Sequence, residues 1–476
     1  MKQIIYQLLP RLWGKGKFSS IDRKSLDYWK SLGTDYLWYT GVIRHATHST
    51  AGGFAPSKVV KGDAGSPYAI IDYYDVNPYL ADDPAHRMDE FLQLVQRTHQ
   101  AGMKVIIDFV PNHVARENVN FGQEDNTSVH WAAENDFYYY PGQELRLPVA
   151  CPGYKEFPAK ASGNAFTPSP GKNDWYETIR LNYCDFHTHT WDKMLDVVRF
   201  WAGKGVDGFR CDMVEMVPPA FMKWLIASIK DQYPDLLFVA EVYEEEKYRM
   251  YAEEVGFDLL YDKTGLYDSV RAITCQGLSA RLLTWNWQFL GNLQPRMLNF
   301  LENHDEQRVA SDFFCGSAAN GYAALAVSLL LNTAPFMLYF GQEAGERGMQ
   351  AEGFSGLDGR TSIFDWCSVP AFSHPDQSVL ARYRELLTLS RQAPFASGKT
   401  FDLCYCQDAS FDADRLFAWL RSDGQQTWLL CANFGPKADI TLRIPPEAID
   451  YLKIKAHQTA FSLTVPEKDY AILPVE

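Results

Sequence analysis

An acidic side chain follows an arginine at the end of an apolar run in residues 205–216, GVDGFRCDMVEM. Arg210 and Asp212 are two positions apart, so on a β-strand both side chains point to the same face. A guanidinium group beside a carboxylate favours the ionised carboxylate through its charge and its hydrogen bonds. An ionised carboxylate held at a strand end is a candidate nucleophile, although a purely structural Arg–Asp pair has the same pattern.

Three further apolar runs end in polar residues of the same kind. They are KVIIDFVPNHV (residues 104–114), LFVAEVY (237–243) and FLENHDEQR (300–308), and they offer Asp108, Asn112, His113, Glu241, His304 and Asp305. Each group alone is as consistent with helix capping or an ion pair as with catalysis. Several carboxylates in one pocket repel one another, and a fold accepts this mainly for chemistry or metal binding.

The elements that carry these residues alternate between strand-like and helix-like patterns. Strands are predicted at residues 4–9, 35–39, 104–109, 206–211, 236–241, 257–260, 297–301 and 336–339, and helices at residues 24–32, 84–101, 190–202, 218–229, 244–254, 322–331 and 378–390. Eight such units indicate an α/β fold with parallel strands, a TIM (β/α)8 barrel. Because the chemistry of such barrels lies at the C-terminal strand ends, the four polar stretches should meet there.

Three regions depart from this alternation. Residues 114–183 are rich in Asn, Pro, Gly and aromatic residues and are too long for a simple connection, so we expect an inserted domain beside the active face. Residues 344–378 are Gly-rich and are placed to line the site as well. Short alternating runs after residue 394 predict a C-terminal antiparallel β-sandwich. The expected division is residues 1–113 and 184–393 for the barrel, 114–183 for the insertion and 394–476 for the C-terminal domain.

Composition bears on partners and location. The net charge is −14 and there is no run rich in Lys or Arg, which argues against nucleic acid and anionic membranes as partners. The nine cysteines show no CxxC spacing, the N-terminus is typical of a first strand rather than a signal peptide, and no apolar run is long enough to span a membrane. These features predict a cytoplasmic protein with free thiols and leave the oligomeric state open.

The acidic residues suit hydrolysis of a glycosidic bond with retention of configuration. One ionised carboxylate attacks the anomeric carbon, and a second carboxyl group protonates the leaving oxygen and later deprotonates water. Asp212 beside Arg210 fits the first role. Glu241 lies among apolar sequence neighbours, which favour a protonated carboxyl group, and fits the second.

The sequences DFVPNH, GFRCD, AEVY and ENHD, in this order, resemble the four signature regions of the α-amylase family, glycoside hydrolase family 13. The resemblance covers about the whole chain and implies the barrel, an inserted domain B and a β-sandwich domain C. The roles it implies are nucleophile for Asp212, general acid/base for Glu241, transition-state stabiliser for Asp305, orientation of the nucleophile for Arg210, sugar binding for Tyr68, His113 and His304, and a supporting carboxylate for Asp108.

The sequence does not decide whether the protein binds calcium or which glycosidic bond it prefers. Asn112 matches a calcium ligand of the family, whereas Glu215 and Met216 stand where many α-amylases have Lys-His, whose His carbonyl often ligates calcium. The chemistry itself requires no cofactor, so a structural calcium ion is an open possibility. Met213 fits neither the small residue of typical α-1,4 enzymes nor the valine of α-1,6 enzymes.

The function expected from these residues is retaining hydrolysis of α-glucosidic, mainly α-1,4, bonds in maltodextrins or starch-derived oligosaccharides. An α-glucanotransferase and an α-1,6-active glucosidase are alternatives on the same scaffold. A non-catalytic carbohydrate-binding protein is a third alternative, against which the presence of all three candidate acids argues.

Overall fold

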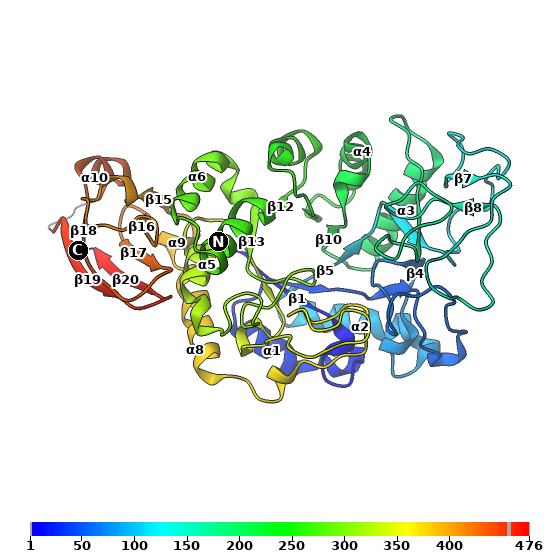
Figure 1. Cartoon of the computed structure of the whole chain (residues 1–476), viewed down its shortest axis with the longest axis horizontal. Coiled ribbons are helices and arrows are strands. Elements are labelled where there is room, and N and C mark those ends of the chain that lie inside the picture. Colours follow the sequence, from blue (N-terminus) through cyan, green and yellow to red (C-terminus); the bar gives the residue numbers. More distant parts are fainter. Residues whose placement is uncertain (1, 455–457, 476) are drawn as a thin grey trace.

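A closed barrel of eight parallel strands forms the centre of the computed structural model, which describes residues 2–454 and 458–475 (Figure 1). Around the barrel the strands are β1 (Ile4–Leu8), β14 (Phe336–Tyr339), β13 (Met297–Phe300), β12 (Leu259–Tyr261), β11 (Leu237–Ala240), β10 (Gly208–Cys211), β5 (Lys104–Phe109) and β2 (Tyr36–Tyr39). The predicted TIM barrel is confirmed. Nearly all strand residues are buried, because side chains fill the inside of the barrel and helices cover its outside.

Helices surround the barrel. They are α1 (Arg23–Ser31), α2 (Arg87–Gln100), α3 (His189–Gly203), α4 (Pro219–Lys230), α5 (Asp268–Gln276), α6 (Arg281–Leu290), α7 (Tyr322–Leu330) and α8 (Gln377–Ser390). The single helix predicted over residues 244–254 is wrong: a 3-10 turn (Glu245–Lys247) precedes a π-helical segment (Met250–Val255). The spacing of apolar residues does not distinguish the tighter 3-10 helix or the wider π-helix from an α-helix.

The N-terminal end of β10 carries polar contacts of its own. Asp207 accepts a hydrogen bond from the backbone N–H of Val105 at 2.7 Å, and its carboxylate lies 2.7 Å from His99 Nε2. These contacts join β10 to β5 and α2 at the end of the barrel opposite the predicted site, where they serve stability.

The inserted segment is closed by a short antiparallel pair. β6 (His113–Ala115) pairs with β9 (Thr178–Arg180), and β7 (Tyr139–Tyr140) pairs with β8 (Ala159–Lys160) between them. A second hairpin, β3 (Ile43–His45) with β4 (Ile70–Val76), was not predicted. The cyan insertion lies at the right of Figure 1, at the end of the molecule opposite the chain's C-terminus. We keep residues 114–183 as the proposed extent of domain B.

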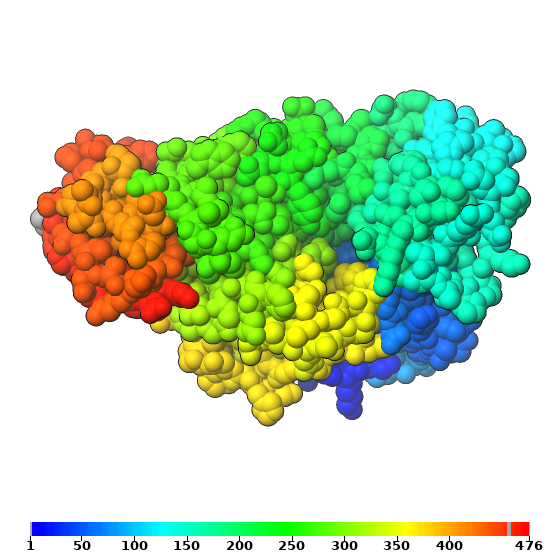
Figure 2. Space-filling view, viewed as in Figure 1, coloured from blue at the N-terminus to red at the C-terminus, as the bar shows by residue number. Residues whose placement is uncertain are grey.

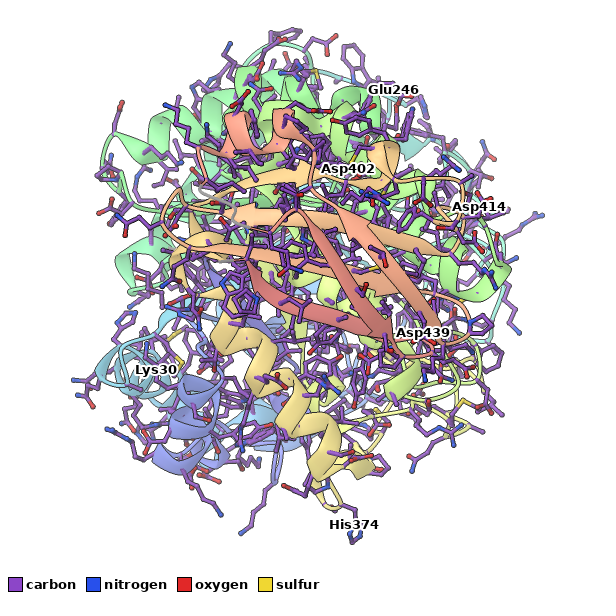
Figure 3. The ribbon with its side chains drawn as sticks, turned by 90° about the vertical axis from the view of Figure 1, so that its left-hand side faces the viewer. Lys30, Glu246, His374, Asp402, Asp414 and Asp439 are labelled. Carbon is purple, nitrogen blue, oxygen red and sulfur yellow. The ribbon has the colours of Figure 1, made fainter. Side chains whose placement is uncertain are left out.

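Antiparallel sheets form the C-terminal part, as predicted. β15 (Lys399–Asp402), β16 (Leu416–Ser422), β17 (Thr427–Asn433) and β20 (Tyr470–Val475) make one sheet, and β18 (Ala438–Arg443) with β19 (Ala460–Val465) makes the other. Their apolar faces and α10 (Pro446–Leu452) share a core. Figure 3 looks onto these sheets with the barrel behind them and labels Asp402 on β15. The Trp419 indole N–H reaches the Leu330 carbonyl at 3.4 Å, which ties the sheet to α7.

Two general features bear on the sequence expectations. All nine cysteines are free thiols in the structure. Among the described residues, no helix has both the length and the apolar character that a membrane crossing requires.

Candidate active site

A pocket of about 320 Å³ opens at the C-terminal ends of the barrel strands. Six of the predicted site residues line it, namely Tyr68, His113, Asp212, Glu241, His304 and Asp305. Sequence reasoning missed other lining residues, among them Lys61, Trp175, Glu177, Tyr243 and Phe364. In Figure 2 the yellow surface of the segment after β14 lies next to the cyan-to-green surface of the insertion. These two segments contribute Phe364 and Trp175 to the pocket wall, which agrees with the expectation that both border the site.

A larger cleft of about 830 Å³ lies between the segment after β1 and the segment before α8. Among the residues that the structure describes, Asp22 is the single acidic residue that lines it. Since paired carboxylates are absent there, the smaller pocket is the candidate active site.

Arg210 joins the two carboxylates that the sequence selected. Its Nη1 lies 2.6 Å from Asp212 Oδ1, and its Nη2 lies 2.5 Å from Glu241 Oε1. The guanidinium group is buried, and its central carbon lies 5.3 to 5.6 Å from the ring centres of Trp38, Tyr68 and Tyr261. The contact with Asp212 was predicted from the i, i+2 spacing. The contact with Glu241 was not, because it crosses from β10 to the neighbouring strand β11.

Asp212 has one paired and one unpaired oxygen. Its Oδ1 accepts from Arg210, whereas its Oδ2 is buried and has no hydrogen-bond partner among the described residues. Burial raises the pKa of the Asp212 carboxyl group well above its usual value, while the Arg210 charge opposes this rise and the Glu241 charge adds to it. Burial thus works against the ionised form that the sequence predicted beside Arg210, and the Arg210 charge offsets this effect only in part. The unpaired Oδ2 is the oxygen whose lone pairs are available for attack on carbon.

Glu241 is surrounded by donors. Its Oε2 accepts from the Met213 N–H at 2.8 Å, and its Oε1 accepts from the Tyr243 hydroxyl at 2.9 Å, in addition to the Arg210 contact. The surroundings of Glu241 are therefore polar, unlike the apolar sequence neighbours from which its role was predicted. Met213 adopts a left-handed backbone with φ of 43°. Such strain in a non-glycine residue is typical of functional sites, and here it accompanies an N–H that donates to Glu241.

Glu215 holds the segment that presents Tyr243. Its Oε2 accepts from the Tyr243 N–H at 2.9 Å, and its Oε1 accepts from the Glu244 N–H at 3.3 Å. The residue is therefore a backbone anchor, at the position where many α-amylases have the lysine of the Lys-His pair. No local pattern could reveal this, because its partners lie on the loop after the next strand.

His304 connects two other predicted site residues, Tyr68 and Asp305, and also contacts Gln7. Its Nδ1 lies 2.8 Å from Gln7 Nε2, and its Nε2 lies 2.5 Å from the Tyr68 hydroxyl and 3.1 Å from Asp305 Oδ2. Burial, together with the Arg210 charge, lowers the pKa of His304 to about 3, so the imidazole is neutral near pH 7. Asp305 keeps 41% of its side chain exposed, and its partial burial raises the pKa of its carboxyl group.

Asp108 lies beneath the pocket on β5, opposite Arg210 in the strand register. Its Oδ2 accepts from the Trp38 indole N–H at 3.1 Å, and its Oδ1 lies 3.8 Å from Arg210 Nη1. Burial raises the pKa of Asp108 to about 7, against the opposing charge of Arg210.

We expect the Asp108→Asn variant to gain thermal stability relative to the wild type as the pH rises. Because the folded-state pKa of about 7 lies above the usual value of 3.8, the native protein holds a proton that the unfolded chain has released, and wild-type stability falls between these two pH values. Asparagine has no such proton. The measurement is the difference in Tm, variant minus wild type, from about pH 4 to about pH 8. A difference that stays constant across this range would contradict the shifted pKa.

Asn112 and His113 lie where the insertion meets the barrel. The His113 ring centre lies 5.0 Å from that of Trp175, and burial lowers the pKa of His113 to about 3, so this histidine is also neutral. The Asn112 side-chain amide donates to the Gly163 carbonyl at 3.0 Å. Arg180 donates to the same carbonyl at 3.2 Å. Asn112 thus lies outside the pocket wall, beside an arginine from the insertion.

Comparison with known proteins agrees with this geometry. The family model of the α-amylase catalytic domain matches residues 14–364. The chain is 24% identical over 425 residues to α-amylase 3 of Dictyoglomus thermophilum, covering 82% of this chain and 76% of that protein. It is 26% identical over 451 residues to α-amylase MalA of Haloarcula japonica, covering 91% of this chain but only 55% of that protein.

A solved structure with the same fold is the cyclic α-maltosyl-(1→6)-maltose hydrolase from Arthrobacter globiformis. It superposes with a TM-score of 0.70 at 18% sequence identity, over 100% of this chain and 99% of that one. At this identity the likeness concerns the fold alone. The family match covers most of the chain, and with the barrel it defines a glycoside hydrolase scaffold. The protein belongs to the α-amylase family, glycoside hydrolase family 13.

Proposed function

We propose that the protein hydrolyses α-glucosidic, mainly α-1,4, bonds of maltodextrins and starch-derived oligosaccharides with retention of configuration. The observation that carries this proposal is the single Arg210 guanidinium that contacts both Asp212 and Glu241. Because one guanidinium contacts both carboxylates, the two acids lie in the same part of the pocket, which supports the short separation (about 5–5.5 Å) that a retaining mechanism requires.

The first step forms a glycosyl-enzyme. Asp212 Oδ2, the oxygen without a hydrogen-bond partner, attacks the anomeric carbon while the Glu241 carboxyl group gives its proton to the leaving oxygen. The C1–O bond to the leaving sugar breaks as the bond to Asp212 forms. Arg210 and the Met213 N–H hold the two carboxyl groups in place during this exchange.

The second step releases the sugar. Glu241, now ionised, takes a proton from water, and the hydroxide oxygen displaces Asp212 from the anomeric carbon. Asp305 stands at the pocket wall, where its negative charge stabilises the oxocarbenium-like transition states of both steps. The neutral His113 and His304 imidazoles and the Tyr68 ring are placed to bind the sugar without adding positive charge.

The substrate class rests on the pocket and on the names of the relatives. Tyr68, Trp175 and Phe364 supply aromatic faces to the wall, and such faces suit the apolar sides of sugar rings. Two relatives are named α-amylases. The neighbour of the same fold is named for a cyclic substrate that also contains an α-1,6 bond, which keeps an α-1,6 activity as the alternative. The cytoplasmic location predicted from the sequence favours short imported oligosaccharides over granular starch.

Product analysis tests the proposal. Maltooligosaccharides, pullulan, cyclodextrins and panose are incubated with the protein and the products are separated by chromatography, while NMR follows the anomer released first. We expect shorter maltooligosaccharides with the α-anomer appearing first. Oligosaccharides longer than a maltotriose substrate would identify a glucanotransferase. Release of maltose and glucose from panose would identify an α-1,6 enzyme, and the β-anomer would identify an inverting mechanism.

A further inference from the structure

Arg180 links the insertion to the loop of the candidate nucleophile. It ends β9 opposite His113, and its side chain is half-buried. Its Nη1 donates to the Gly163 carbonyl at 3.2 Å, and its Nη2 donates to the Met216 carbonyl at 3.0 Å. Gly163 belongs to the insertion, whereas Met216 follows Asp212 on the loop after β10. One side chain therefore joins two segments that are far apart in the sequence.

The Gly163 and Met216 carbonyls lie in the region where the sequence analysis considered a structural calcium ion. Asn112 donates to the Gly163 carbonyl, and Met216 offers the carbonyl expected at its position. Calcium takes six to eight oxygen ligands, with carboxylates among them. Within residues 2–454 and 458–475, no group of three or more His, Cys, Asp or Glu side chains is arranged to hold a metal ion. A cationic side chain already contacts both carbonyls, so the residues present do not fit calcium.

We propose that the Arg180 guanidinium takes the place of a structural cation and holds the insertion against the active-site loop without calcium. Two properties of arginine suit this role. Its group is always charged, and its planar fork can donate to two carbonyl oxygens at once. The Phe166 ring, 5.0 Å from the guanidinium carbon, stabilises the charge from one side.

The charge of Arg180 also acts on the neighbouring site residue. After burial, Arg180 is the largest cause of the lowered pKa of His113. The Arg180 charge thus adds to the effect of burial on His113, while its two hydrogen bonds hold the loop that carries Asp212 to the insertion. Loss of Arg180 should consequently affect both the stability of the insertion and the turnover of the enzyme.

The wild-type protein provides the first test. Its Tm is measured in EDTA and in added CaCl2, and its calcium content is measured by elemental analysis after dialysis. We expect the same Tm in both solutions and calcium well below one ion per chain. A Tm that drops in EDTA, or a tightly held stoichiometric calcium ion, would overturn the proposal.

Arg180 variants provide the second test, with Arg146→Ala as the control at an exposed arginine of the same insertion. Arg180→Ala should lower Tm by on the order of 5 °C, because two charged hydrogen bonds are lost. It should also expose residues 114–183 to limited proteolysis, and it should lower kcat/KM. Arg180→Lys should regain part of each loss, since one ammonium group cannot serve both carbonyls equally.

Each possible result for these variants leads to a different conclusion. An Arg180→Ala protein with the Tm and proteolysis pattern of the control would show that Arg180 does not hold the insertion against the active-site loop. If Arg180→Ala does not fold, the Tm of Arg180→Lys relative to Arg146→Ala decides in its place: a lower Tm supports the proposal and an unchanged Tm contradicts it.

Discussion

The Asp212→Asn variant is expected to lose turnover by roughly 10⁴-fold or more, because it loses the nucleophile that forms the glycosyl-enzyme. Asparagine has nearly the same shape, and its carbonyl oxygen can still accept from Arg210, so the fold and the binding of a maltooligosaccharide should persist. The measurements are kcat on that substrate, its binding by calorimetry and the Tm of the variant.

Asp207→Asn is the matched control, since it makes the same chemical change just before the other end of β10. Asp207 accepts from the Val105 N–H and contacts His99, far from the pocket. We expect this variant to lower Tm and to keep kcat. Near-wild-type turnover by Asp212→Asn would remove Asp212 from the mechanism, and an equal loss in both variants would point to a general effect on β10.

Glu241→Gln should lower kcat on maltooligosaccharides by roughly 10³-fold, the typical contribution of a general acid or base. Its effect should depend on the leaving group, whereas that of Asp212→Asn should not. With α-glucosyl fluoride the leaving group needs no proton, so Glu241→Gln should form the glycosyl-enzyme at close to the wild-type rate and then release it slowly. A burst of fluoride followed by a slow phase is the expected signal.

Two results would contradict this assignment. An equal loss of fluoride release by both variants would mean that Glu241 does more than transfer a proton, for example by holding Arg210 in place. Unchanged turnover on maltooligosaccharides would mean that another group supplies the proton, and the Tyr243 hydroxyl, 2.9 Å from Glu241, would be the first to examine.

Much of the barrel could be predicted because its strands are buried on both faces. The runs at residues 104–109 and 336–339 are apolar and end where β5 and β14 end. The hairpin of β3 and β4 was missed because β3 has only three residues and the register shifts along the pair. β15, β19 and α10 were missed in the C-terminal part, although buried and exposed residues alternate along β19 and gave a usable signal for a strand there.

The parts of the candidate site that could be predicted are those in which a residue's position on its own strand determines where its side chain lies. The i, i+2 spacing of Arg210 and Asp212 fixes their shared face, and the TIM barrel topology brings Glu241 and Asp305 to the same end. Contacts between strands were not accessible in this way. The Met213 N–H donates to Glu241 from a left-handed backbone, and Arg180 reaches Met216 from β9 of the insertion, and no local sequence pattern reports either contact.

The shared guanidinium of Arg210 has a consequence for the timing of the reaction. While both acids are free, its positive charge is divided between them. In the proposed mechanism, esterification of Asp212 by the sugar removes the negative charge of that carboxylate, and the whole charge of Arg210 then acts on Glu241. In the proposed mechanism this is the moment when Glu241 takes a proton from water, and hydrolysis of the ester returns the charge to its starting balance. A single side chain can thereby synchronise the two halves of the catalytic cycle.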